Sequence, residues 1–114
     1  MSDTIFSKII RRELPADIVY EDEEILAFRD INPQAPDHLL IVPRKHIRTT
    51  LDLTTADNAL IGHVFQIAGK IAHDRGFSED GFRVVNNCNE AAGQTVWHIH
   101  FHLLGGRDMT WPPG

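Results

Sequence analysis

The sequence predicts an α+β fold in which one long and one short helix pack on an antiparallel sheet of about five strands. Short stretches rich in β-branched and aromatic residues follow one another with brief connections, which favours antiparallel pairing. One longer segment, between residues 54 and 76, repeats apolar residues at helical spacing. We expect residues 1–114 to form a single domain, because a chain of this length can bury one core.

The first elements are expected to be a short helix, a hairpin and a third strand. Residues 4–12 have a helical apolar stripe, and Asp3 is a suitable N-cap. Residues 18–20 and 25–28 are apolar and flank a polar turn, which predicts a β-hairpin. Residues 38–42 are almost continuously apolar, which indicates a strand covered on both faces.

The second half of the chain contains the long helix and two further strands. Thr54 or Thr55 can cap the helix, and Gly76 suits its end. Residues 82–86 predict one strand and residues 97–104 another, joined by a loop of small and polar residues. Gly105 and Gly106 then end the last strand, and an extended tail follows.

Composition argues against several classes of function. The net charge of −5 disfavours a broad surface for nucleic acid. No apolar run approaches the roughly 20 residues that span a bilayer, and residues 1–4 lack the features of a signal peptide. Cys88 is the only cysteine and cannot form an internal disulfide, which suits the cytosol. We therefore expect a cytoplasmic protein that binds neither nucleic acid nor a membrane.

The most informative segment is residues 97–104, where three histidines alternate with bulky apolar residues. Successive side chains on a strand point to opposite faces. His98, His100 and His102 should therefore lie on one face, while Trp97 and its apolar companions lie on the other. These could be ordinary solvent-facing histidines, but three imidazoles in a row repel one another when protonated.

A metal site is the second interpretation. The outer Cα atoms of a three-histidine row lie ~13 Å apart on a strand, whereas zinc needs each nitrogen at ~2.0–2.1 Å. A metal would therefore require two of these histidines and a ligand from elsewhere, such as His38. Neither a cysteine pair nor a carboxylate cluster near the row supports one, and we expect no metal and no other cofactor.

The third interpretation is covalent and acid–base chemistry. A neutral imidazole nitrogen can attack phosphorus, and a neighbouring imidazole can protonate the leaving group. His100 has a histidine on each side of it on the same face. The loop at residues 91–95 has small side chains and accessible backbone N–H groups that can approach phosphate oxygens.

The run His-Ile-His-Phe-His-Leu-Leu at residues 98–104 resembles the signature of the histidine triad family of nucleotide hydrolases and transferases. Further segments resemble the Hint branch of that family, at residues 3–6, 28–36, 38–43, 93–96, 104–107 and 111–114. The resemblance covers nearly the whole chain. It implies a HIT-like fold and a metal-free homodimer that cleaves the P–N bond of purine nucleoside 5′-phosphoramidates through a nucleotidyl-histidine.

The resemblance also implies catalytic roles. His100 would be the nucleophile, and the backbone carbonyl of His98 would hold the other nitrogen of its ring. His102 and His38 would contact the phosphate or assist proton transfer. The residues expected to bind phosphate oxygens are Asn87, Gly93 and Thr95.

The nucleoside and the partner subunit would be contacted by other segments. Asp30 would bind the ribose hydroxyls, and Trp111 would reach toward the site of the partner subunit or else tether the tail. Arg29 lies where the branch also has histidine, beside the base. The apolar slot for the purine would consist of Ile5, Phe6, Ile9, Phe28 and Ile31, of which Ile9 also suits a plain core.

Two alternative functions stay open. One is a dinucleoside polyphosphate hydrolase of the same family, against which Gly105, Gly106 and the terminal Trp-Pro-Pro-Gly argue. The other is a nucleotide-binding adaptor with little catalysis, against which the intact triad weighs. The remaining histidines, His46, His63 and His73, lack triad-like neighbours in sequence, and those on the long helix are expected to be surface or structural residues.

Overall fold

The computed structural model describes residues 3–114, so part of the signal-peptide expectation, at Met1 and Ser2, lies outside the described residues. The helices are α1 (Ile5–Ile10) and α2 (Asn58–Asp74). Single 3-10 turns lie at Thr50–Asp52, Thr55–Asp57 and Glu90–Ala92. The strands are β1 (Ile18–Glu21), β2 (Ile25–Arg29), β3 (Asp37–Pro43), β4 (Phe82–Val85) and β5 (Phe101–Gly105).

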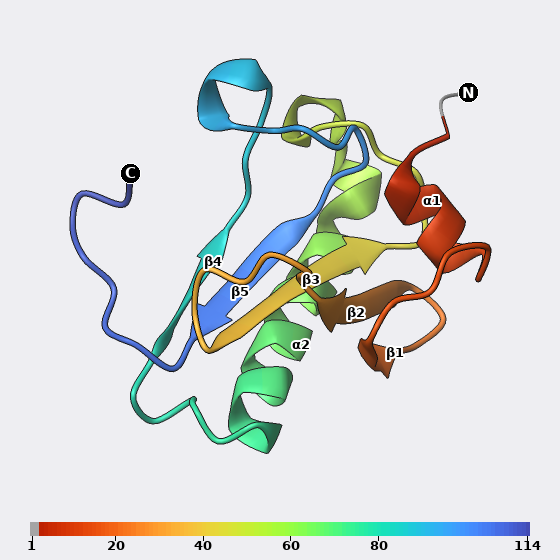
Figure 1. Cartoon of the computed structure of the whole chain (residues 1–114). Helices are drawn as coiled ribbons and strands as arrows, with labels where there is room; N and C mark the ends of the chain where they lie inside the picture. Colours follow the sequence, from red (N-terminus) through yellow and green to blue (C-terminus); the bar gives the residue numbers. More distant parts are fainter. Residues whose placement is uncertain (1–2) are drawn as a thin grey trace.

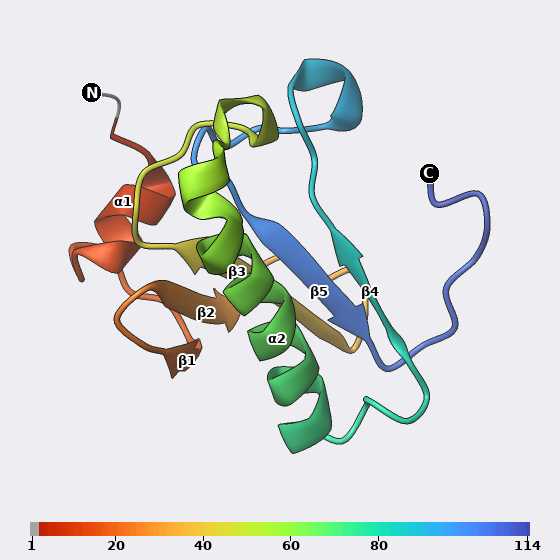
Figure 2. The ribbon, with the colours of Figure 1, turned by 180° about the vertical axis from the view of Figure 1, so that it is seen from behind.

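The strands form one antiparallel sheet in the order β1-β2-β3-β5-β4 (Figure 1). The long helix α2 runs across one face of this sheet, as the reverse view shows (Figure 2). The short helix α1 lies toward the end of β3, near the chain's N-terminus (Figure 1). The α+β fold with one long helix, one short helix and a five-stranded sheet is therefore confirmed.

Strand alternation divides the core into two clusters. In β3, Leu39 and Ile41 pack into the cluster that contains the buried face of α2. Leu40 and Val42 pack into the second cluster, which contains Phe6 and other residues of α1. The expected cover on both faces of this strand is confirmed, because neighbouring residues of a strand point to opposite faces.

The helix termini differ in detail from the expectation. Thr4 caps α1 instead of Asp3. Its side chain accepts from the Ser7 N–H at 3.1 Å, and the Ser7 hydroxyl oxygen accepts from the Thr4 N–H at 3.2 Å. Asp3 instead pairs with Arg11 at 2.6 Å. Thr54 caps the 3-10 turn that leads into α2 rather than α2 itself.

The fifth strand is shorter than predicted and begins only at Phe101. Its pairing with β3 ends at Ile41, and the Ile99 N–H donates to the carbonyl of Ile47, in the loop after β3, at 2.7 Å. Alternation persists in this loop-like stretch, because Ile99 is buried beneath α2 with Phe101. Trp97 does not follow it: the indole is partly exposed, and the Arg48 guanidinium lies 4.5 Å from its ring centroid.

No helix formed by residues 3–114 combines the length and apolar character needed to cross a bilayer.

The end of β5 provides a test of close packing. A Cβ atom added to Gly105 would lie 2.6 Å from Cε1 and 2.9 Å from Cγ of the buried Phe77 ring. We predict that Gly105→Ala lowers the free energy of unfolding by about 1–3 kcal/mol, because the ring has to move within a packed core. Urea denaturation measures this change.

The matched control is Gly62→Ala, in the exposed interior of α2. Nothing lies within 4 Å of a Cβ atom at Gly62. Alanine there should raise the free energy of unfolding by about 0.5–1 kcal/mol through helix propensity. Equal stability of Gly105→Ala and the unsubstituted protein would contradict the packing argument.

Candidate active site

A cavity of about 530 Å³ brings together segments that lie far apart in sequence. Most residues expected to hold a nucleotide line it, namely Ile5, Phe6, Ile9, Phe28, Asp30, Ile31, Asn87, Gly93, Thr95, His100 and His102. The sequence interpretation did not include five further lining residues, namely Leu14, Pro15, Ala16, Leu40 and Val96. The wall from α1, residues 14–16 and β2 is apolar, whereas residues 87–102 supply polar groups. The cavity therefore suits a ligand with an apolar body and a polar or charged group.

His100 is the buried imidazole of this cavity, with only 7% of its surface exposed. Its Nδ1 lies 2.9 Å from the backbone carbonyl oxygen of His98. A carbonyl only accepts, so Nδ1 carries the proton and Nε2 keeps its lone pair. The ring of Phe6 packs edge-on against this imidazole, with centroids 4.9 Å apart. The hydrogen bond that the resemblance implies is present, and it leaves Nε2 as a potential nucleophile.

Burial keeps His100 uncharged. It lowers the pKa of His100, although the bond to the His98 carbonyl and the charge of Asp30 oppose this shift. An uncharged ring is the form in which Nε2 can attack an electrophile.

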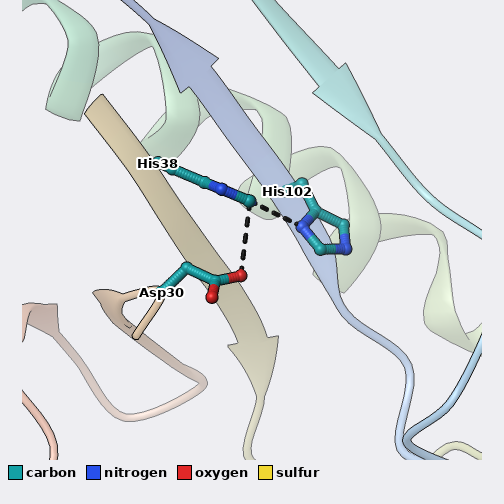
Figure 3. Close-up of side chains that lie close together, drawn as sticks. All are labelled: Asp30, His38 and His102. Carbon is teal, nitrogen blue, oxygen red and sulfur yellow. Dashed lines mark hydrogen bonds and ion pairs between the residues drawn. The ribbon is translucent and has the colours of Figure 1, made fainter. Parts of the chain in front are cut away.

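A second chain of hydrogen bonds ends at His102 (Figure 3). The backbone N–H of Gln34 donates to His38 Nδ1 at 2.9 Å, so the proton of a neutral His38 lies on Nε2. His38 Nε2 in turn lies 2.8 Å from His102 Nδ1, which must accept. The proton of His102 therefore lies on Nε2, and this ring presents one donor away from His38.

Burial also lowers the pKa values of His102 and His38. Burial lowers the pKa of His102 to about 4, and the neighbouring rings of His100 and His38 add to the effect. Burial also lowers the pKa of His38, against the opposing charge of Asp30. Both rings are therefore neutral at physiological pH unless a bound anion changes their surroundings.

Asp30 completes this cluster and raises the question of a metal again. One ligand atom from each of Asp30, His38 and His102 lies within 4.8 Å of the others. This carboxylate was not foreseen near the histidines. However, His38 Nε2 carries a proton, and its 2.8 Å separation from His102 Nδ1 is a hydrogen-bond distance. Two nitrogens on a tetrahedral zinc would lie roughly 3.3 Å apart, so the cluster fits a hydrogen-bond chain better than a metal site.

Four expected site residues lie outside the cavity lining. His38 lies behind His102, and His98 is only 1% exposed beside His100. Arg29, expected beside the base, does not line the cavity, and its guanidinium pairs with Asp17 at 3.6 Å. Alternation along β2 explains this, because the preceding residue, Phe28, faces α1.

Trp111 is the fourth residue outside the cavity. It is 83% exposed, on a C-terminal tail that runs away from the sheet beyond β4 (Figure 1). It therefore does not tether the tail through packing. Ile31, in contrast, lines the cavity although it is 98% exposed, which places it at the mouth.

The loop that carries Gly93 and Thr95 is held by a buried amide that the sequence interpretation did not single out. Gln94 donates to the carbonyls of Arg48 at 3.0 Å and Val96 at 3.1 Å, and accepts from the Asn89 N–H at 2.8 Å. Gly93 has φ +91°, a left-handed conformation that favours glycine. A lone glutamine in a polar loop carries no sequence signal that it will be buried.

Two further residues support the histidines. Asn86, rather than its neighbour Asn87, donates to the His100 carbonyl at 2.9 Å. His46, which has no triad-like neighbour in sequence, lies against His98, with their Nδ1 atoms 3.3 Å apart. The sequence did not indicate this contact of His46, whereas His63, on α2, is a structural residue, as expected, and bonds to Asp22 at 2.7 Å.

Comparisons with known proteins point to one family. A family model described as the HIT domain matches residues 11–109. A purine nucleoside phosphoramidase from Escherichia coli is 52% identical over 107 residues, covering 94% of this chain and 90% of that protein. An uncharacterized HIT-like protein from Synechococcus elongatus is 55% identical over 112 residues, which cover 98% of this chain and 97% of that protein. A crystal structure of a HIT family hydrolase from Legionella pneumophila superposes with a TM-score of 0.96 and 54% identity, covering 98% of this chain and 100% of that one.

The chain therefore belongs to the HIT family, which confirms the resemblance seen in its histidine-rich segment. The similarity extends over nearly the full chain, and two of the similar structures, from Legionella pneumophila and Clostridium thermocellum, are each described as a HIT family hydrolase.

Neutral buried histidines should make the folded protein sensitive to acid. The pKa of His102 falls from 6.5 to about 4 on folding, so the unfolded chain binds more protons between these values. The stabilisation is therefore complete above about pH 6.5 and is lost as the pH falls toward about 4. We predict that His102→Asn, which keeps an acceptor for His38, weakens this pH dependence.

Urea denaturation at about pH 7.5 and about pH 5 measures the change in unfolding free energy. His73→Asn is the matched control, because His73 is exposed on α2 and bonds only to its neighbour Asp74 among the described residues. This control should keep the original pH profile. An unchanged profile in His102→Asn would show that this imidazole is not held neutral by burial.

Proposed function

We propose that this protein hydrolyses the P–N bond of purine nucleoside 5′-phosphoramidates, releasing a nucleoside monophosphate and an amine. The observation that carries the proposal is the bond from His100 Nδ1–H to the His98 carbonyl, which leaves the Nε2 lone pair in a nucleotide-sized cavity. The 52% identity to a purine nucleoside phosphoramidase supports the same reaction.

In the proposed reaction, His100 Nε2 attacks phosphorus, a new N–P bond forms, and the bond to the leaving amine breaks. The resulting nucleotidyl-histidine is then hydrolysed by water, which frees Nε2 again. The Nδ1–H donated to the His98 carbonyl stabilises the positive charge that develops on the ring during attack.

The leaving amine needs a proton, and the pair of His102 and His38 is placed to supply it. The negative charge of a bound substrate favours the protonated form of this pair, and Asp30, 3.4 Å from His38 Nε2, acts in the same direction. The pair delivers the proton through His102 Nε2, which lies away from His38. It regains a proton from the water that cleaves the intermediate.

The remaining lining residues take the roles that the resemblance implies. Asn87, Gly93 and Thr95 would bind the phosphate oxygens at the polar wall of the cavity. Asp30 accepts from the Asn32 N–H at 2.9 Å, and its carboxylate retains lone pairs for the ribose hydroxyls. The purine would lie in the apolar slot, where Phe6 packs against Phe28.

We also propose that the protein is a homodimer. Strand β4 lies at the edge of the sheet, so a second copy can pair with it across a two-fold axis. The exposed Trp111 would then contact the site of the partner subunit. Light scattering of the purified protein measures the oligomeric state.

The central prediction concerns the nucleophile. We expect His100→Ala to lower kcat on adenosine 5′-phosphoramidate by at least ~10³-fold, because no other group can form the covalent intermediate. Its affinity for adenosine monophosphate and its urea midpoint should change little. Steady-state kinetics and titration calorimetry measure these effects, with His73→Ala on the exposed face of α2 as the matched control.

Three other results would contradict the proposal. Retained turnover by His100→Ala would remove the assignment of the nucleophile. Faster hydrolysis of a dinucleoside polyphosphate than of the phosphoramidate would favour the related hydrolase activity. Tight nucleotide binding with background turnover by the unsubstituted protein would favour an adaptor. Mass spectrometry of rapidly quenched reactions should show the nucleotidyl adduct on His100.

A further inference from the structure

The peptide bond between His98 and Ile99 is clamped from both sides. Its N–H, which belongs to Ile99, donates to the Ile47 carbonyl at 2.7 Å. Its carbonyl, which belongs to His98, accepts from His100 Nδ1 at 2.9 Å. A trans peptide is planar, and its N–H and C=O point in opposite directions. The loop after β3 therefore sets the direction of the carbonyl that orients His100.

The side chain of His98 ties the same peptide to the same loop. Its Nε2 lies 2.7 Å from the Pro43 carbonyl oxygen, so Nε2 carries the proton. Burial lowers the pKa of His98, and the ring is therefore neutral. A neutral ring with its proton on Nε2 has a lone pair on Nδ1, which needs a donor because His98 is only 1% exposed.

His46 supplies that donor among the described residues. Its Nδ1 lies 3.3 Å from His98 Nδ1, and the two rings meet edge to face with centroids 5.1 Å apart. Because His98 Nδ1 must accept, the proton of this bond belongs to His46. His46 does not line the cavity in which the substrate is proposed to bind.

We propose that His46 is a positioning residue for the nucleophile. By donating to His98 Nδ1, it holds His98 in the tautomer that bonds to Pro43, and so keeps the His98 carbonyl aimed at His100. The catalytic consequence rests on the proposed function. The link between the three histidines rests on the hydrogen bonds alone.

The opposite tautomer of His98 shows why the donor matters. A proton on Nδ1 would leave the Nε2 lone pair facing the Pro43 carbonyl oxygen at 2.7 Å, which is repulsive. Without the His46 donor, the correct tautomer instead leaves a buried acceptor unpaired. Either state weakens the attachment of His98 to the loop after β3, and with it the bond to His100.

Other charged groups near these rings are already engaged. Asp3, Arg11 and Arg44 line a small cavity with His46 and His98. Arg11 pairs with Asp3, and Arg44 pairs with Glu21 at 3.1 Å. On the other side of His100, the centroid of the His102 ring lies 5.3 Å away, and the charge of Asp30 acts to raise the pKa of His100.

The test compares two substitutions of the exposed His46. His46→Leu removes the donor, whereas His46→Asn places an amide N–H close to the position of Nδ1. Nitrogen-15 NMR of the imidazoles reports the tautomer of His98 directly, without any substrate. We expect a single tautomer, with the proton on Nε2, in the unsubstituted protein and in His46→Asn, and a mixture of tautomers in His46→Leu.

Kinetics on adenosine 5′-phosphoramidate then separates positioning from plain stability. His46→Leu should lower kcat about 10-fold with KM within about twofold, since a misaimed group slows reaction more than it weakens binding. The acid limb of its kcat/KM profile should move to lower pH, because the weakened carbonyl bond no longer raises the pKa of His100. His46→Asn should restore most of kcat.

His63→Leu is the matched control, because it removes a different imidazole that bonds to Asp22. It should leave the tautomer of His98 and the pH profile unchanged. An unchanged His98 tautomer in His46→Leu would overturn the proposal, and so would a shifted tautomer with unchanged kcat. Absence of phosphoramidate hydrolysis by the unsubstituted protein would overturn the proposed function instead, and the NMR comparison would still decide the link to His98.

Discussion

The hydrogen bond from His100 Nδ1 to the His98 carbonyl is the contact on which the chemistry of this site depends. It joins a side chain to the backbone two residues earlier, so it requires a fixed backbone between them. That backbone cannot be a continuing strand of the sheet, because its Ile99 N–H is donated to the loop after β3. The late start of β5 thus serves an arrangement in which a neutral imidazole exposes one lone pair.

Burial has two effects on this arrangement. One core cluster packs β3 and β5 on α2, the other packs β3 on α1, and together they fix where the histidines emerge. The same burial lowers the pKa of His98, His100 and His102, so the three rings avoid the mutual repulsion of a charged row. Neutral rings in turn need complementary donors and acceptors. The carbonyls of Pro43 and His98 accept from His98 and His100, and His102 accepts from His38, which the Gln34 N–H orients.

Local signals predicted much of this fold. The apolar spacing predicted α2, the polar turn predicted the β1–β2 hairpin, and the continuous apolar run predicted a strand covered on both faces. Detail at the ends of elements was less accurate, since Thr4 rather than Asp3 caps α1. Those boundaries depend on which side-chain and backbone groups meet in space, and spacing along the chain does not specify that.

The sequence by itself determined the alternation that separates the histidines from the core, because this follows from local periodicity. It also determined the family and, through the resemblance to that family, most residues of the cavity, because runs of residue types carry that resemblance. Only the tertiary structure decided how the histidines are connected. The contacts of His46 with His98 and of His38 with His102 join residues separated by 52 and 64 positions. Such contacts, like the burial of Gln94 and the outward turn of Arg29, arise when distant segments pack together, and no local pattern encodes them.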